Sequence, residues 1–370
     1  MAETTTARRI PVTELERFMI AAFMKIGVPE TDARICAEVL SESDRRGIDS
    51  HGIARFKGIY YDRIKQGTQL PVTKETIIKD GSTTAVIDAG NGMGQVASKH
   101  AMALTIKKAK AYGMGMVTVR GSNHYGIAGY YVTMATNEGM IGITGTNARP
   151  SVAPTFGVEN MLGTNPLTIG IPTDEAFPFV LDCATSLSQR GKVEVYARAK
   201  KPLPAGWVIG SDGATQTDAT AILDALTRGN AALAPLGGIG EETAGYKGYG
   251  YCTVVEILSA ALAQGAFLKM LSGVSEGKKV PHRLGHFFMA VDVEAFTELP
   301  AFKKTAGDIL RQLRASKKMP GHTRIYTAGE KEYDAWQERR TAGIPITDET
   351  WREITTVCTE CGLIAPKPLR

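Results

Sequence analysis

The sequence predicts a globular protein built from both helices and strands, without a Rossmann-type dinucleotide-binding unit. Three observations lead to this fold class. Apolar residues recur at helical spacing near both ends of the chain, and short apolar runs bounded by glycine are concentrated in its middle. The one strand–glycine–helix unit that looks like a dinucleotide fingerprint lacks two of the residues that such a fingerprint needs.

Helices are predicted over residues 11–46 and 52–66. Thr13 can cap the first helix, and apolar residues return every three or four positions after it. The segment 28–32 breaks this run. The second helix ends in two arginines followed by Gly47, and cations followed by glycine are a common C-terminal stop signal.

A strand over 84–88 runs into three glycines and a helix over 95–112. This order resembles a dinucleotide-binding fingerprint, but the third glycine of G-x-G-x-x-G should stand where Gln95 stands. The acidic residue expected after the next strand, 116–119, is replaced by Arg120. We therefore interpret the glycines as a tight turn between a strand and a helix.

The rest of the chain alternates strands and helices around glycine-rich stretches. Residues 147–172 are rich in Gly, Pro and Asn, and such a segment leaves backbone amides free to meet a ligand. The sequence contains no internal repeat or long linker, so a second domain would be an insertion. The remaining predicted elements are helix 127–138, strand 141–146, strand 179–182, helix 187–198, helix 251–270, strand 286–292, and helices 301–315, 330–340 and 345–361.

The composition fits a globular protein that acts on a small anionic molecule. The chain has 370 residues, of which 43% are hydrophobic and 22% charged, and its net charge is +5. Bases and acids are mixed along it, which argues against a nucleic-acid partner. Because no apolar run reaches the roughly 18 residues of a membrane span and the N-terminus is polar, we expect a cytoplasmic protein without a membrane partner. Its five cysteines, an odd number, do not form a disulfide framework.

Ser50, His51 and Arg55 are the strongest candidates for chemistry. A Ser–His pair can set the tautomer of the imidazole and relay a proton. Arg55, four residues after His51, can grip a carboxylate with its planar guanidinium. An acid–base group beside such a grip is what a 2-hydroxy or 2-oxo acid needs. The alternative interpretation is a helix end followed by an exposed basic turn.

His124 and Lys247 are further candidates. Like His51, His124 stands beside small polar residues and glycine at an element boundary, although a hydrogen-bonding loop residue is the alternative for both histidines. Lys247 lies between glycines but lacks the spacing of a Walker motif. It could place one ammonium against a phosphate or a carboxylate.

Two motifs that resemble metal sites are interpreted as structural. His282 and His286 have the i,i+4 spacing of a zinc pair, but a nearby proline and glycine oppose the helix that such a pair needs. Cys358 and Cys361 form a lone C-x-x-C, which we interpret as two reduced core thiols. No metal ligand is predicted.

Six segments stand out along the chain, and their order and spacing match those of one known family over about residues 10–340. They are Asp49-Ser50-His51-Gly52-Ile53-Ala54-Arg55, Ser122-Asn123-His124-Tyr125-Gly126, Leu162-Gly163-Thr164-Asn165-Pro166-Leu167, Leu181-Asp182-Cys183-Ala184-Thr185-Ser186, Gly191-Lys192-Val193 and Lys247-Gly248-Tyr249-Gly250. Together they resemble the malate/L-lactate dehydrogenase family, which also includes L-sulfolactate, ureidoglycolate and diketogulonate dehydrogenases. No single segment is decisive, but six in register are specific.

The resemblance implies an α+β fold of the L-sulfolactate dehydrogenase type, which binds NAD or NADP without a Rossmann unit. It implies an N-terminal helical region over 1–80 on the substrate side, packed with 300–370. It implies that the cofactor is held by a region with a mixed or antiparallel sheet, inserted over 81–299. It also implies a homodimer whose active site lies close to the subunit interface.

The resemblance further implies roles for single residues. His51 looks like the proton donor to the carbonyl oxygen, with Ser50 beside it, and Arg55 looks like the grip on the substrate carboxylate. His124 matches an acid–base residue of some members and is the alternative donor, and Thr164 looks like a substrate contact. The implied cofactor contacts are His124, Tyr125, Gly126, Ile127, Ala128, Asp182, Cys183, Ala184, Lys247, Ala328, Gly329 and Glu330.

Some positions depart from the family pattern. Cys183 stands where Met is common, and Lys192 occupies a position that is acidic in the imine-reducing branch, which weakens a cyclic imino acid as the substrate. The segment 237–245 resembles that of the malate and sulfolactate branches. The expected reaction is NAD(P)-dependent hydride transfer between a 2-hydroxy acid and a 2-oxo acid, malate and oxaloacetate first. L-sulfolactate, L-lactate or a cyclic imino acid are the alternatives.

Overall fold

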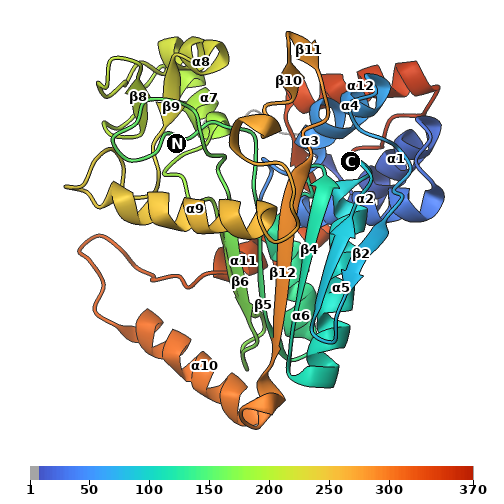
Figure 1. Cartoon of the computed structure of the whole chain (residues 1–370), viewed down its shortest axis with the longest axis vertical. Helices are drawn as coiled ribbons and strands as arrows, with labels where there is room; N and C mark the ends of the chain where they lie inside the picture. The colour runs from blue at the N-terminus through green and yellow to red at the C-terminus, as the bar shows by residue number, and fades with distance from the viewer. Residues whose placement is uncertain (1–7, 370) are drawn as a thin grey trace.

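The computed structural model describes residues 8–369 and is organised around a seven-stranded mixed sheet (Figure 1). The strand order is β2-β3-β4-β12-β5-β6-β7, and every neighbouring pair is antiparallel except β3 and β4, which are parallel. The strands are β2 (Thr76–Asp80), β3 (Thr84–Asp88), β4 (Met114–Ser122), β5 (Met140–Thr146), β6 (Leu167–Ile171), β7 (Phe179–Cys183) and β12 (Leu284–Asp292).

Helices cover both faces of this sheet. On one face, α5 (Gly94–Tyr112) and α6 (Ala128–Asn137) bury a core that includes Phe288 of β12. On the other face, α9 (Gly245–Ala260) crosses β12 so closely that a Cβ on Gly285 would lie 2.0 Å from the carbonyl oxygen of Ser259. The odd and even residues of a strand point to opposite faces, so β12 serves both layers.

A helical bundle beside the sheet brings the two ends of the chain together. β1 (Arg8–Ile10) pairs with β13 (Ile344–Ile346), and α12 (Asp348–Cys361) contributes to the same core as α1 (Val12–Lys25). The buried residues of α1 recur every three or four positions, as the sequence pattern predicted. The other elements of the bundle are α2 (Glu30–Arg45), α3 (Ile53–Arg55), the π-helical η1 (Phe56–Tyr61) and α4 (Asp62–Lys65).

A smaller group of elements lies between β7 and α9 in the chain. Here α7 (Arg190–Arg198) and α8 (Ala219–Arg228) share a core with β8 (Val208–Gly210) and β9 (Ala231–Leu233), at the upper left of Figure 1. The Asp218 carboxylate caps α8 by accepting bonds from two backbone N–H groups. The remaining elements are η2 (Leu268–Leu271), β10 (Val274–Ser275), β11 (Lys278–Lys279), η3 (Val293–Ala295), α10 (Leu299–Ala315) and α11 (Glu330–Ala342).

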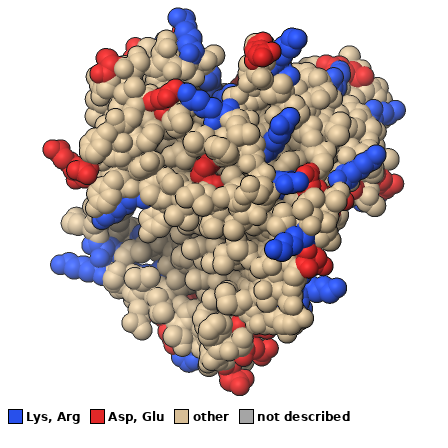
Figure 2. Space-filling model, in the orientation of Figure 1, with Lys and Arg blue, Asp and Glu red and all other residues tan. Residues whose placement is uncertain are grey.

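The surface carries charges of both signs. On the face shown in Figure 2, Lys and Arg side chains are interspersed with Asp and Glu side chains. In the part of the chain that the structure describes, none of the helices is both long and apolar enough to cross a lipid bilayer.

The predicted α+β class, with a mixed sheet and an N-terminal helical bundle, is confirmed. The prediction of a helix over 251–270 was wrong, because α9 ends at Ala260. The chain turns there: the N–H of Gly265 donates to the Ala260 carbonyl, and Gln264 adopts a φ of 51°. The stretch 147–172, rich in Gly, Pro and Asn, is not irregular throughout, since β6 lies within it and pairs with both β5 and β7. The division into 1–80 with 300–370 and 81–299 stays a prediction.

Candidate active site

The turn that carries Ser50 and His51 is built on a buried carboxyl group at the end of α2. Asp44 is 1% exposed, and its Oδ2 accepts a 2.8 Å hydrogen bond from the Ile53 N–H. A Cβ on Gly52 would lie 1.9 Å from Asp44 Oδ1, so only glycine lets the turn close over this carboxyl. Burial, the largest cause, raises the pKa of Asp44 to about 8.

Two histidines from distant parts of the chain meet beside this turn. The Ser50 hydroxyl lies 2.8 Å from His51 Nδ1, and Arg55 Nε donates to the Ser50 carbonyl at 2.7 Å. The rings of His51 and His124 stack with centroids 5.7 Å apart and an interplanar angle of 24°. The Tyr60 hydroxyl lies 2.5 Å from His124 Nδ1. The structure therefore brings Ser50, His51, Arg55 and His124 together, as expected if all four contact one substrate.

Both imidazoles favour the neutral state. Burial and then the charge of Arg55 lower the pKa of His51 to about 4. Burial lowers the pKa of His124 well below its ordinary value, and the positive charges of His51, Arg63 and Arg55 add to the effect. Because the Gly126 N–H also donates to His124 Nδ1, at 3.2 Å, we assign the proton of neutral His124 to Nε2.

In the loop after His124, the backbone conformation is tightly constrained and the side chains are mostly buried. Gly126 has a φ of 83°, and a Cβ there would lie 2.5 Å from Val39, so glycine is required. The Tyr125 ring stacks on His286 at 4.6 Å inside the core. Tyr125, Ile127 and Ala128 are each 3% exposed, so any contact of theirs with a cofactor would be made mainly through the backbone.

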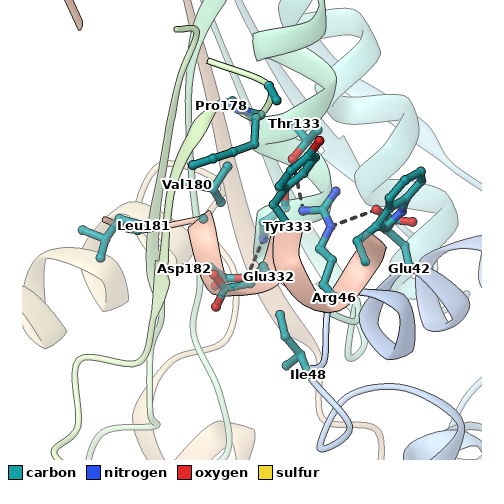
Figure 3. A pocket seen from close by; sticks show the side chains of 16 residues that line it. Glu42, Arg46, Ile48, Thr133, Pro178, Val180, Leu181, Asp182, Glu332 and Tyr333 are labelled. Atoms are coloured by element: carbon teal, nitrogen blue, oxygen red, sulfur yellow. Dashed lines mark hydrogen bonds and ion pairs between the residues drawn. The ribbon is translucent and has the colours of Figure 1, made fainter. Parts of the chain in front are cut away.

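A cavity of about 410 Å³ opens between α2, α6, β7 and α11 (Figure 3). Three of the predicted cofactor residues, Asp182, Ala328 and Gly329, line it. Ile48, which belongs to the same turn as Ser50 and His51, lines it too. Figure 3 shows Arg46 inside the cavity, bonded to Glu42 at 2.9 Å and to the Thr133 hydroxyl at 3.2 Å. The cavity and the histidine pair therefore share one turn of the chain.

The walls of the cavity are held by hydrogen bonds to Asp182. Its Oδ2 accepts from the Gly129 N–H at 2.7 Å, in the first turn of α6, and its Oδ1 accepts from the Thr168 hydroxyl at 2.9 Å. Burial raises the pKa of Asp182, although both hydrogen bonds oppose the change. After Asp182, Cys183 is exposed and Ala184 is partly buried.

The late loop at the cavity is packed against β7. The Ala328 carbonyl accepts from the Val180 N–H at 3.3 Å, and Gly329 has a φ of 91°, a conformation that suits glycine. The Glu330 carboxylate turns away into the protein, where it accepts from the Thr327 N–H at 2.9 Å and pairs with Arg324. Its predicted contact with a cofactor stays a prediction.

Thr164 and Lys247 are two predicted site residues that no described contact joins to the histidine pair. The Thr164 carbonyl accepts from the Thr185 N–H at 3.0 Å, which ties its loop to the end of β7. Lys247 lies in the first turn of α9, with its ammonium 5.8 Å from the ring centre of Tyr246. Their roles toward substrate and cofactor stay predictions.

The other histidines and cysteines have structural surroundings. Both ring nitrogens of His286 meet hydroxyl groups, those of Thr146 at 2.7 Å and Ser122 at 2.8 Å. Over residues 8–369, no group of three or more His, Cys, Asp or Glu side chains is arranged to hold a metal ion. Cys358 is buried, and Cys361 is partly buried.

Tyr60 and Asp44 are neighbours of the site that the sequence analysis did not identify. In the sequence, Tyr60 is one more apolar position of the helix predicted over 52–66. In the structure it lies in the π-helical η1, and its hydroxyl is directed to His124. Asp44 reads as a charged residue near a helix end. No local pattern distinguishes a buried carboxyl group there from an exposed one.

Comparisons with known proteins agree with this arrangement. The model of the malate/L-lactate dehydrogenase family matches residues 10–355. The chain is 42% identical over 356 residues to the malate dehydrogenase of Pyrococcus horikoshii, covering 96% of each sequence. It is 36% identical to the L-sulfolactate dehydrogenase of Methanocaldococcus jannaschii, covering 94% of this chain and 96% of that enzyme.

The fold agrees with solved structures as well. The crystal structure of malate dehydrogenase from Entamoeba histolytica superposes with a TM-score of 0.94 at 45% identity, covering 98% of this chain and 100% of that one. That of sulfolactate dehydrogenase from Methanocaldococcus jannaschii gives a TM-score of 0.85 at 35% identity, over 96% and 98% of the chains. The chain therefore belongs to the malate/L-lactate dehydrogenase family and is a nicotinamide-dependent 2-hydroxyacid dehydrogenase.

Proposed function

We propose that the protein interconverts malate and oxaloacetate with NAD or NADP. The observation that carries the proposal is the stacked pair of His51 and His124, with Arg55 bonded to the backbone of Ser50 beside it. This arrangement offers a proton site and a carboxylate grip on one turn of the chain. The 42% identity to an enzyme named malate dehydrogenase supports the substrate. L-sulfolactate, L-lactate and cyclic imino acids are the alternatives.

In the proposed mechanism, the chain orients the acid and handles one proton. The two Nη groups of Arg55 hold the carboxylate at C1, because Nε is already occupied by the Ser50 carbonyl. This grip turns C2 toward the nicotinamide, which accepts or donates the hydride when bound. A histidine takes the proton from the C2 hydroxyl as malate is oxidised, a contribution of about 10²–10⁴-fold in rate for such acid–base groups.

We assign the proton transfer to His51. Nδ1 of His124 accepts from Gly126 and contacts Tyr60, which favours one neutral tautomer that donates through Nε2. That geometry suits a fixed hydrogen-bond donor to the C2 oxygen. His51 is only partly buried, and the Ser50 hydroxyl can rotate to donate to Nδ1 or to accept from it. His51 can therefore change protonation state with little rearrangement.

The cavity of about 410 Å³ is the proposed site for the nucleoside end of the cofactor. Its size falls within the roughly 300–1,000 Å³ of small-molecule sites, and its walls are mainly apolar with a few polar groups. Arg46, Asp182 and Glu332 are among the residues that give this lining its polar groups. Because Ile48 belongs both to the cavity wall and to the turn of His51, a dinucleotide seated there could extend toward the histidine pair.

We also propose that the protein acts as a homodimer in the cytoplasm. Apolar side chains that are about half exposed form a stripe along α9 and the segment that follows, which is unusual for a monomer: Tyr251, Val254, Ile257, Leu262, Phe267 and Met270. A second cavity of about 680 Å³ lies beside them. All five cysteines are free, which fits a reducing compartment.

The test of the function follows the absorbance of the reduced nicotinamide with purified protein, NADH or NADPH, and a panel of 2-oxo acids. We expect oxaloacetate-dependent oxidation of the coenzyme that persists with a chelator present. In Arg55→Lys, the charge remains but the forked grip is lost, so KM for oxaloacetate should rise about tenfold while KM for the coenzyme stays near that of the wild type. An unchanged KM for oxaloacetate would remove Arg55 from the grip.

A further inference from the structure

Two segments that are far apart in the chain form adjoining walls of the cavity of about 410 Å³ (Figure 3). One is the turn between β6 and β7, with residues 176–178, and the other is the start of α11, with residues 328–333. The rings of Phe177 and Tyr333 stack across the two walls, with centroids 5.2 Å apart and an interplanar angle of 29°. The width of the cavity on this side therefore depends on how these two segments are held together.

Arg314, in the last turn of α10, contacts a carboxylate beside each wall. Its Nη2 donates to Glu175 Oε1 at 2.5 Å, and its Nη1 lies 3.6 Å from Glu330 Oε2. Glu175 directly precedes the first wall, and Glu330 lies within the second. Only 19% of the Arg314 side chain is exposed, so this guanidinium forms a largely enclosed bridge between the two walls.

Each of the two bridged carboxylates also has an arginine of its own. Glu175 Oε1 accepts from Arg311 Nη1 at 3.0 Å, and Glu330 pairs with Arg324. Burial, the largest effect, raises the pKa of Glu330, but its hydrogen bonds and the charges of its arginines together hold that pKa below the ordinary value. Among the ion pairs of residues 8–369, neither Arg311 nor Arg324 reaches the carboxylate on the other wall.

The other described contacts of α10 with the β6–β7 turn reach the first wall alone. The Asp174 N–H donates to the Lys303 carbonyl at 3.2 Å, and Arg311 Nη1 donates to Asp174 Oδ1 at 2.9 Å. A Cβ on Gly307 would lie 1.7 Å from the same carboxylate oxygen, so α10 and the turn are closely packed. Arg314 is thus the side chain through which this packed unit is joined to the second wall.

We propose that Arg314 is a positioning residue, which sets the affinity of the cavity for the coenzyme by holding its two walls together. The proposal rests on the proposed function, in which the cavity receives the nucleoside end of NAD or NADP. Arg314 does not line the cavity, so it acts through the placement of residues 176–178 and 328–333. Without the bridge, each carboxylate keeps one arginine, but the two walls become freer to move. Binding must then order them, which weakens the affinity.

The test is a fluorescence titration of NADH and NADPH into the wild type, Arg314→Gln and Arg311→Gln. For the coenzyme that the wild type prefers, Kd should rise about 5- to 20-fold in Arg314→Gln and change less than about twofold in Arg311→Gln. Arg311→Gln is the matched control, since it removes a cation from the same helix and a partner of Glu175 without touching Glu330. An unchanged Kd in Arg314→Gln, or an equal rise in both variants, would overturn the proposal.

A conservative variant covers a failure of the glutamine variant to fold. Arg314→Lys keeps the positive charge, but its single ammonium cannot fork to both carboxylates. Its Kd for the coenzyme should lie between those of the wild type and Arg314→Gln. A Kd for Arg314→Lys equal to that of the wild type would show that charge alone suffices and would overturn the bridge.

Steady-state kinetics and the titration separate this proposal from the proposed function. At saturating coenzyme, kcat and KM for oxaloacetate in Arg314→Gln should stay within about twofold of the wild type, while KM for the coenzyme rises. A lower kcat with an unchanged Kd for the coenzyme would overturn the positioning role. Because the titration needs no turnover, weaker coenzyme binding in a protein that reduces no 2-oxo acid would sink the proposed function and leave the positioning role standing.

Discussion

At the scale of single residues, the site depends on two neutral imidazoles, those of His51 and His124, held beside the guanidinium group of Arg55. For malate oxidation the neutral form of His51 is the required base, and it is present above the pKa of about 4 that burial and Arg55 impose on the free protein. We therefore expect kcat/KM for malate to rise with pH through a limb near pH 4 and to be level above it. His51→Asn should lower kcat strongly and remove the limb.

His124→Asn is the matched variant for this profile. It should weaken substrate or coenzyme binding yet keep the acid limb, because His124 is proposed to act as a fixed donor. NADH titration by fluorescence should give near wild-type affinity in His51→Asn. Loss of the limb in the His124 variant and its retention in the His51 variant would reverse the two roles.

Asp44 gives a second prediction at this scale, on stability. Its pKa of about 8 in the folded protein exceeds that of an unfolded aspartate, so the folded state binds the proton more tightly. This contribution to stability is fully present below the unfolded pKa of about 4 and is lost progressively as pH rises from there through about 8. Asp44→Asn keeps an oxygen acceptor for the Ile53 N–H and has no proton to lose.

The free energy of unfolding of Asp44→Asn minus that of the wild type should therefore be more positive at pH 8 than at pH 5, by on the order of 1–3 kcal/mol. Urea denaturation of both proteins at the two pH values measures it. A difference between variant and wild type that is the same at both values would show that Asp44 is not protonated in the folded state near neutrality.

At the scale of elements, the turn between α2 and α3 sets the position of the catalytic groups. Gly52→Ala should destabilise the protein by more than about 2 kcal/mol and abolish activity, because its Cβ would meet the buried Asp44 carboxyl at 1.9 Å. Gly58→Ala in η1 is the control, since a Cβ there meets no atom within 4 Å. Thermal unfolding of both variants provides the comparison, and equal melting temperatures would contradict this account of the turn.

Elements with strong local signals were predictable, and contacts between distant residues were not. The apolar spacing of α1 and the glycine stop after α2 predicted two helices of the bundle, and the chemistry of the residues singled out the stretch from Ser50 to Arg55. The meeting of Tyr60 with His124 joins positions 64 residues apart, and no local pattern encodes it.

At the scale of the whole molecule, the apolar stripe on α9 predicts the oligomeric state. A glutamate at Ile257, which is 54% exposed, would place a charge in the proposed interface, so Ile257→Glu should be a monomer where the wild type is a dimer. Ile309→Glu on α10, also 54% exposed, should leave the dimer intact. Sedimentation velocity at micromolar concentration distinguishes the species. A wild-type monomer would exclude the proposed interface.

The position of β12 in the sheet has a consequence for how the chain folds. β4 and β5 are close in sequence, yet β12, made of residues 284–292, separates them and pairs with both. Until synthesis has passed residue 292, two long strand edges lack their partner, and unpaired edges invite association with other chains. Sheet closure thus depends on contacts of large sequence separation, which slow folding. A nascent chain of this protein would need protection from aggregation until most of its length has emerged from the ribosome.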